Sequence, residues 1–328
     1  MASSSWELLA QVRKFVPPLL SKFHKGQAGR VVVIGGSEDY TGAPFFAAQA
    51  ATLLGADMSH IICEKAAGQV IKTYSPNLMV HPYMRDSQSI GNLKLDDVLK
   101  PIYALLDRIH VVVVGPGLGR DKIMLDIASS VIQRAREKDL HIVIDADGLY
   151  LVQQNPDVIK GYAKAILTPN IVEFQRLCNA LHISVPDYFP ESQIAAKELC
   201  VQVAKAFGGL TIIAKGQVDY ISNGTDTLAN DSPGGLKRVG GQGDTLSGTA
   251  ATFLAWKYAY QNSLWQHDNS LSDERLTLLA AYGASSITRY CSRTAFKKYG
   301  RAMLASNLSE MIGDAYDDLI EKKLDGKI

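Results

Sequence analysis

The sequence lacks several features that would point to particular classes of protein. Its 34 Lys and Arg residues are balanced by 33 Asp and Glu residues, so the formal net charge of +1 gives no electrostatic argument for binding nucleic acid. No apolar stretch approaches the roughly 20 residues that a membrane-spanning helix needs. The N-terminus has no basic segment followed by an apolar core, as a secretory signal would. These absences predict a cytoplasmic protein that binds neither nucleic acid nor a membrane.

Common catalytic and metal-binding motifs are also missing. The four cysteines, at 63, 178, 200 and 291, form no CxxC or mixed Cys/His pattern, so no structural zinc site is expected. Neither a GxxxxGK[ST] phosphate loop nor a GxSxG nucleophile turn occurs. The seven histidines include no HExxH pair, and we expect none of them to be catalytic.

What the sequence does contain is a repeated alternation of short β-branched runs and helical stretches. Apolar runs separated by helices are typical of a parallel sheet that is buried on both faces. An Asn223-Gly224 turn within residues 218–228 predicts a hairpin that extends the sheet with antiparallel strands. The fold class expected is therefore α/β, with a central, mostly parallel sheet, helices on both faces and a short antiparallel extension. The predicted strands are 30–34, 59–63, 109–114, 141–144, 165–167 and 209–214, and the predicted helices are about 6–23, 43–55, 65–73, 121–138, 171–181, 244–260, 274–292 and 308–323.

No linker is long enough to force a division into domains. We therefore expect residues 1–328 to form a single domain, with residues 1–24 as a helical extension that Pro17-Pro18 interrupts. Right-handed crossovers would place the carboxyl ends of the parallel strands at one edge of the sheet, where ligands bind in such folds. Gly115–Gly119, Asp145, Asn170 and Lys215 are then expected to lie near the turn Gly240–Asp244.

That turn, with the sequence Gly240-Gly241-Gln242-Gly243-Asp244, opens a predicted helix. Glycine-rich turns at helix starts expose N–H groups that attract anions, above all phosphate. Asp244 is then either a base beside a phosphate or a simple N-cap.

Other residues near this edge of the sheet also allow two interpretations. The Gly115–Gly119 loop has a GxGxG spacing that fits a close ligand approach or a tight turn. Asn170 and Glu173 could cap a helix or, beside phosphate, hold Mg²⁺ through water. Lys215 could bind a phosphate or lie free at the surface. Asp145 and Asp147 fit a metal site or an Asx turn.

Several of these motifs follow one another in an order that resembles the ATP-dependent NAD(P)H-hydrate dehydratase family of eukaryotic type, over about residues 20–325. The combination of Tyr40-Thr41-Gly42-Ala43-Pro44 with the Gly-x-Gly-Asp turn carries the resemblance, whereas that turn alone is shared with the wider ribokinase-like superfamily. The other matching stretches are Lys25–Gln27, Gly35–Ser37, Gly115–Gly119, Asp145–Gly148, Thr168–Phe174 and Lys215-Gly216.

The resemblance implies a ribokinase-like fold and a lyase of nicotinamide-nucleotide repair. Such an enzyme uses ATP to dehydrate the S epimer of hydrated NADH or NADPH (NADHX or NADPHX), beside an epimerase that interconverts the two epimers. It also implies that Asp244 is the catalytic acid/base and contacts the substrate, that Glu173 holds Mg²⁺ through water, and that three sets of residues bind the ligands. The hydrate would contact Gly117, Asn170, Ile171, Val172, Glu173, Phe174, Gln175 and Arg176; ATP would contact Lys215, Gly216, Gln217, Val218 and Asp219, and also Gly234, Gly235, Leu236, Lys237, Arg238, Val239, Gly240, Gly241, Gln242 and Gly243.

Two other functions stay open at this point. The first is a ribokinase-like kinase that acts on a small molecule such as a vitamin precursor, which would share the phosphate turn. The second is a non-catalytic nucleotide-binding protein, against which the presence of Asp244 argues. The sequence leaves open the choice between ATP and ADP, between NADHX and NADPHX, the association of identical chains, and a requirement for a monovalent cation.

Overall fold

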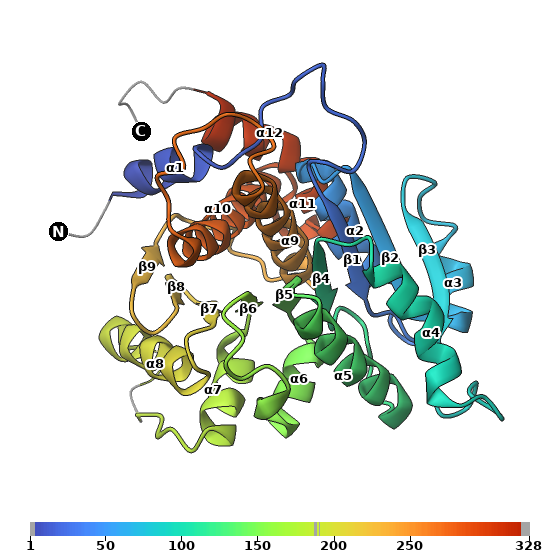
Figure 1. Ribbon diagram of the computed structural model, residues 1–328. Coiled ribbons are helices and arrows are strands. Elements are labelled where there is room, and N and C mark those ends of the chain that lie inside the picture. The colour runs from blue at the N-terminus through green and yellow to red at the C-terminus, as the bar shows by residue number, and fades with distance from the viewer. Residues whose placement is uncertain (1–3, 187–188, 190, 323–328) are drawn as a thin grey trace.

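The computed structural model describes residues 4–186, 189 and 191–322. Their strands form one sheet in the order β3-β2-β1-β4-β5-β6-β7-β8-β9 (Figure 1). Neighbouring strands from β3 to β7 are parallel, whereas the β7–β8 and β8–β9 pairs are antiparallel. The expected mostly parallel sheet with an antiparallel end is confirmed. The strands are β1 (Arg30–Ile34), β2 (Met58–Glu64), β3 (Met79–Met84), β4 (Val111–Val114), β5 (His141–Ile144), β6 (Ala165–Leu167), β7 (Thr211–Ala214), β8 (Asp219–Ser222) and β9 (Thr227–Asn230).

Helices cover both faces of the sheet, and the alternation of side chains along each strand explains why. In β1, Val31 and Val33 belong to one buried core and Val32 and Ile34 to the other. The first core includes α1 (Ser5–Arg13), α2 (Gly42–Leu54), α3 (Lys65–Ile71), α9 (Gln242–Gln261), α10 (Asp273–Tyr299), α11 (Ala305–Glu310) and α12 (Ile312–Tyr316). The second core includes α4 (Leu95–Leu106), α5 (Lys122–Glu137), α6 (Asp147–Gln154), α7 (Ile171–Ala180) and α8 (Gln193–Ala206). Figure 1 shows α9 and α10 above the arc of strands and α5 to α8 below it.

The strands predicted from the sequence are all present, but two helix predictions are wrong. The helix expected over 6–23, with a break at Pro17-Pro18, ends earlier, at Arg13, and does not resume after the break, because Pro17 and Pro18 lack the N–H groups to continue it. The helix expected over 308–323 is divided into α11, α12 and a π-helical turn at Asp317–Glu321; residue 323 lies outside the described residues. The elements β3, α4, α6 and α8 were not predicted.

The first and last described segments lie side by side. The Arg13 side chain donates to the carbonyls of Leu319 and Lys322, at 3.0 and 2.9 Å. Phe15, which is fully buried, lies edge-on to Phe253 of α9, with ring centroids 6.2 Å apart. None of the described helices is long and apolar enough to cross a membrane.

Candidate active site at the carboxyl ends of the strands

The turn that opens α9 depends on glycine. Gly241, the N-cap, has a φ of +97°, which side chains rarely allow, and a Cβ there would lie 2.5 Å from the Cβ of Ala305. The Gln242 N–H donates to the Val239 carbonyl at 3.4 Å. The N–H groups of Gly243 and Asp244 come next in the first turn, where a helix supplies no acceptor of its own. Free N–H groups at a helix start can bind an anion, so this turn is a candidate anion site with Asp244 beside it.

Asp244 is a buried carboxyl group, only 7% exposed. Burial and the negative charge of Asp145 raise its pKa to about 8, against the opposing effect of Lys215. Within the described residues its carboxyl group takes part in no hydrogen bond or ion pair. In its deprotonated form, a carboxyl group with this pKa is a stronger base than an ordinary carboxylate and can take a proton from a hydroxyl group.

The ends of β5, β6 and β7 bring three polar side chains to the start of α9. The Lys215 ammonium lies 3.3 Å from Asp145 Oδ1, which also accepts from the Thr168 hydroxyl at 2.8 Å. A Cβ on Gly243 would lie 3.5 Å from Lys215 Nζ and 3.4 Å from Asp145 Oδ2. Burial lowers the pKa of Lys215, but the surrounding carboxylates, Asp145 foremost, raise it above its ordinary value. Lys215 is therefore a cation fixed beside Asp145 at the anion site, not a free surface lysine.

The loops after β1 and β4 meet where the strand order reverses, the place at which such sheets bind ligands. The carbonyl of Gly117 accepts from the Gly36 N–H and from the Ser37 hydroxyl, both at 3.0 Å. Gly117 has a φ of +62°, and a Cβ there would lie 2.7 Å from the carbonyl of Tyr40. The Tyr40–Pro44 stretch therefore packs directly on the Gly115–Gly119 loop. This close packing leaves no room for a side chain at Gly117.

Residues Asn170 and Glu173 form a reciprocal cap at the start of α7. The Glu173 N–H donates to Asn170 Oδ1 at 3.0 Å, and the Asn170 N–H donates to Glu173 Oε2 at 2.8 Å. Burial raises the pKa of Glu173 in spite of the nearby Lys215. The capping interpretation is therefore confirmed, while a bond to Mg²⁺ stays a prediction.

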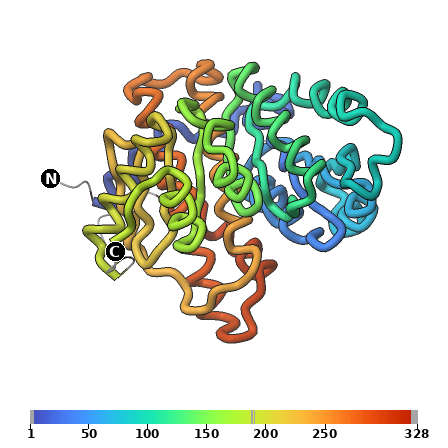
Figure 2. The backbone as a smooth tube through the Cα atoms, turned by 90° about the horizontal axis from the view of Figure 1, so that it is seen from below, coloured from blue at the N-terminus to red at the C-terminus, as the bar shows by residue number. Residues whose placement is uncertain are grey.

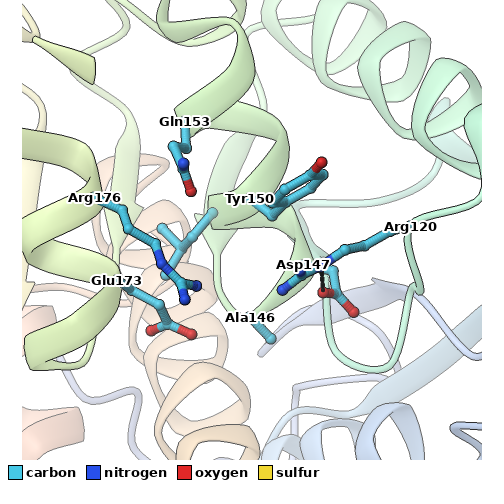
Figure 3. A pocket seen from close by; sticks show the side chains of 8 residues that line it. Arg120, Ala146, Asp147, Tyr150, Gln153, Glu173 and Arg176 are labelled. Carbon is cyan, nitrogen blue, oxygen red and sulfur yellow. Dashed lines mark hydrogen bonds and ion pairs between the residues drawn. The ribbon is translucent and has the colours of Figure 1, made fainter. Parts of the chain in front are cut away.

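A small cavity of about 110 Å³ lies between α6 and α7 (Figure 3). Figure 3 shows Glu173 and Arg176 reaching into it from α7, with Gln153 above them. On the far side Arg120 bonds Asp147 at 3.2 Å and lies over the ring of Tyr150. Of the lining residues, the sequence had assigned only Glu173 and Arg176 to the hydrate site. Arg120, Tyr150 and Gln153 belong to no sequence motif, so the sequence could not have identified them as lining this cavity.

The two segments assigned to ATP lie close to α10 and to the residues that follow it. In Figure 2 the chain leading into α9 lies beside the segment after α10, where Lys237 Nζ donates to the carbonyls of Arg301 and Met303 at 2.6 and 2.7 Å. Leu236 is 83% exposed. A second cavity, of about 260 Å³, is lined by residues 215–218 together with Ile171 and Phe174 of the hydrate set. The two predicted ligand sets are therefore not separate in space.

Among the described residues, no group of three or more His, Cys, Asp or Glu side chains could hold a metal ion. Mg²⁺, however, commonly keeps several waters and binds one or two carboxylates together with substrate phosphates. The half-buried carboxylate of Glu173, near Lys215, fits an ion that arrives with a nucleotide. It does not form a metal cage by itself.

The model of a known protein family, described as NAD(P)H-hydrate dehydratase, matches residues 31–314. The chain belongs to this family. It is 54% identical to the ATP-dependent (S)-NAD(P)H-hydrate dehydratase of Phaeosphaeria nodorum, over 97% of this chain and 96% of the relative. It is 47% identical to the enzyme of that name from Schizosaccharomyces pombe, over 97% of this chain and 94% of the relative.

Solved structures of similar fold are more distant in sequence. The ADP/ATP-dependent NAD(P)H-hydrate dehydratase of Bacillus subtilis, co-crystallised with ATP and Mg²⁺, has a TM-score of 0.65 at 21% identity, over 95% of this chain and 97% of that one. A ribokinase-like superfamily protein of Enterococcus faecalis has a TM-score of 0.70 at 22% identity, over 98% of this chain and 96% of that one. These likenesses confirm the ribokinase-like fold of this family member.

Proposed function

We propose that the chain uses ATP to dehydrate the S epimer of NADH or NADPH hydrate, restoring the reduced nucleotide. The relatives of high identity carry the name of this reaction. The observation in this chain that supports it best is the buried Asp244, which lies in the first turn of α9 beside the anion site. A protein that only bound a nucleotide would need the anion site but not a buried carboxyl group with a raised pKa.

In the proposed mechanism Asp244 takes the proton from the hydroxyl group of the hydrate. The oxygen attacks the γ-phosphorus of ATP, the bond to the β-phosphate oxygen breaks, and ADP leaves. The N–H groups of Gly243 and Asp244 and the ammonium of Lys215 stabilise the charge on the phosphoryl oxygens. The ring nitrogen then expels inorganic phosphate, and loss of a ring proton restores the carbon–carbon double bond. Phosphorylation is needed because hydroxide is a poor leaving group.

We also propose that Mg²⁺ binds with ATP, held by Glu173 through water. Bound there, it would neutralise part of the phosphate charge. Gly117 and the segment 170–176 would contact the hydrate, while residues 215–219 and 234–243 would contact ATP. The cytoplasm as compartment and the action beside an epimerase remain proposals from the sequence.

Absorbance at 340 nm tests the reaction directly. On mixing the protein with S-NADH hydrate, Mg²⁺ and ATP, we expect a rise that does not occur without ATP. A flat trace from a folded, ATP-binding protein would contradict the proposal, and a stable phosphorylated product would favour the kinase alternative. The same assay with ADP and with NADPH hydrate settles the two substrate preferences.

A further inference from the structure

Arg289, in the middle of α10, is a nearly buried cation outside the residues that the sequence assigned to the site. Its side chain is 13% exposed, and its Nη1 lies 2.9 Å from Oδ1 of Asp219. The same guanidinium donates to three backbone carbonyls. Nε donates to that of Ser232, while Nη1 and Nη2 donate to those of Gly216 and Gln217. One side chain thus bonds two loops that are separated by the β8–β9 hairpin.

The carboxylate of Asp219 is held on its other sides as well. The Gly216 N–H donates to Oδ1 at 3.0 Å, and the Ser285 hydroxyl donates to Oδ2 at 2.7 Å. Asn230, at the end of β9, donates to the Ser285 oxygen at 2.8 Å. A buried ion pair is tolerated when its remaining polar groups are hydrogen-bonded in this way. The network therefore fixes the Asp219 side chain, the loop before β8 and the loop after β9 to α10.

These two loops include or adjoin the segments 215–219 and 234–243. Arg289 holds the two loops by their backbone carbonyls, which point at it from different directions. Only a planar side chain with several N–H donors, such as the guanidinium group, can bond all of them at once. A loop already held in one conformation loses less conformational freedom when a ligand binds, so its affinity is higher.

We propose that Arg289 is a positioning residue that holds both nucleotide-binding loops in place before ATP arrives. This inference rests on the proposed binding of ATP by these segments. Arg289 would act through the loops and take no part in proton or phosphoryl transfer. Its loss should therefore weaken ATP binding more than it slows the chemical step.

The test is Arg289→Lys, which keeps a positive charge beside Asp219 but cannot form the fork of hydrogen bonds. Loops that Arg289 no longer holds must be ordered when ATP binds, and we expect this cost to raise the Kd for ATP about tenfold or more. We expect this rise by calorimetry, with a matching rise in the KM for ATP. The kcat and the KM for the hydrate should stay within about threefold, since Asp244 and its surroundings are unchanged.

Arg293→Lys is the matched control. Arg293 lies one turn further along α10 and donates to a single loop carbonyl, that of Pro233, at 3.1 Å. We expect its Kd for ATP to stay within about twofold of the wild type, as for the loss of one exposed contact. Equal effects of the two substitutions, or an unchanged Kd in Arg289→Lys, would overturn the inference. If the wild type binds no ATP, the proposed function fails as well, which is a separate result.

Hydrogen exchange in the wild-type chain supplies a second test that needs no variant. If Arg289 holds the loops, the loop N–H groups that have an acceptor, those of Gly216 (to Asp219) and Ser232 (to Asn230), should exchange slowly before ATP is added. Rapid exchange that slows only with ATP would mean that the nucleotide orders the loops, and this too would overturn the inference.

Discussion

At the scale of single residues, the properties that suit Asp244 to catalysis also destabilise the fold. Burial raises its pKa from an ordinary 3.8 to about 8. Below about pH 4 the carboxyl group is protonated in both folded and unfolded chains, so it has no effect on stability. Between pH 4 and pH 8 the unfolded chain releases the proton while the folded chain retains it, so stability falls as pH rises. The loss is complete only above about pH 8.

Asp244→Asn should therefore be less active and more stable. We expect kcat to fall by at least about 10²-fold, the usual contribution of a general base. At pH 8 the free energy of unfolding should rise by roughly 1–3 kcal/mol, and at pH 4 it should barely change. Turnover at 340 nm and urea unfolding at the two pH values measure both effects. Wild-type turnover would exclude Asp244 as the base.

The pH dependence of activity should follow the same carboxyl group. We expect kcat/KM for the hydrate, with saturating ATP, to rise with pH and level off above about pH 8 as Asp244 loses its proton. Asp145→Asn removes a negative charge that raises this pKa, so the rise should move to lower pH even if the maximum rate falls. If the pH profile of kcat/KM is unchanged in Asp145→Asn, or moves to higher pH, Asp244 is not the group whose ionisation controls activity.

At the scale of elements, the position of α9 depends on its close approach to α2. A Cβ on Gly248 would lie 2.1 Å from the carbonyl of Ala47, which is backbone and cannot rotate away. The Thr252 hydroxyl, one turn further along α9, donates to the Ala51 carbonyl at 3.0 Å. The α2–α9 contact thus sets where the first turn of α9, with Asp244, meets the ends of the strands.

Gly248→Ala should move these helices apart. Overpacking of this kind typically costs 1–3 kcal/mol, and we expect a loss of about that size or more together with lower activity, since α9 carries Asp244. Gly313→Ala, in α12, is the control, because a Cβ there meets nothing within 4 Å. It should be neutral or stabilise the fold by up to about 1 kcal/mol. Thermal unfolding of both variants tests this prediction. Equal melting temperatures would contradict it, because they would show that α2 and α9 can move apart at no cost in stability.

The sequence allowed prediction of elements whose pattern is local, and failed where the pattern depends on tertiary contacts. Strands such as β4, a run of four valines, are buried on both faces and are visible as apolar runs. The edge strand β3 contains a proline and is half-buried for most of its length, so it shows no such run. The approach of Asp145, Lys215 and Asp244 followed from topology. The contacts of Arg289 did not, because this residue lies in the middle of α10 and not at the carboxyl end of a strand, so the sheet topology says nothing about its partners.

At the scale of the whole molecule, we propose that the N-terminal segment is an integral part of a single domain. The sequence predicted a helical extension. In the structure Leu8, Leu9, Val12 and Phe15 are all buried in the core shared with α9 and α10. Each such side chain contributes roughly 1.5–3 kcal/mol on burial. Together they would contribute an amount comparable to the 5–15 kcal/mol by which a domain is usually stable.

Phe15→Ala tests this proposal. Removing a buried ring typically costs about 3–5 kcal/mol, and here it would leave a cavity against Phe253. Leu19→Ala is the matched control in the same segment, because Leu19 is 100% exposed and its loss should change stability by less than about 0.5 kcal/mol. Urea unfolding compares the two, and the KM for ATP should be unchanged in both because neither residue contacts the site. A cost below about 1 kcal/mol for Phe15→Ala would mean that the segment is an attached extension whose packing the domain does not need.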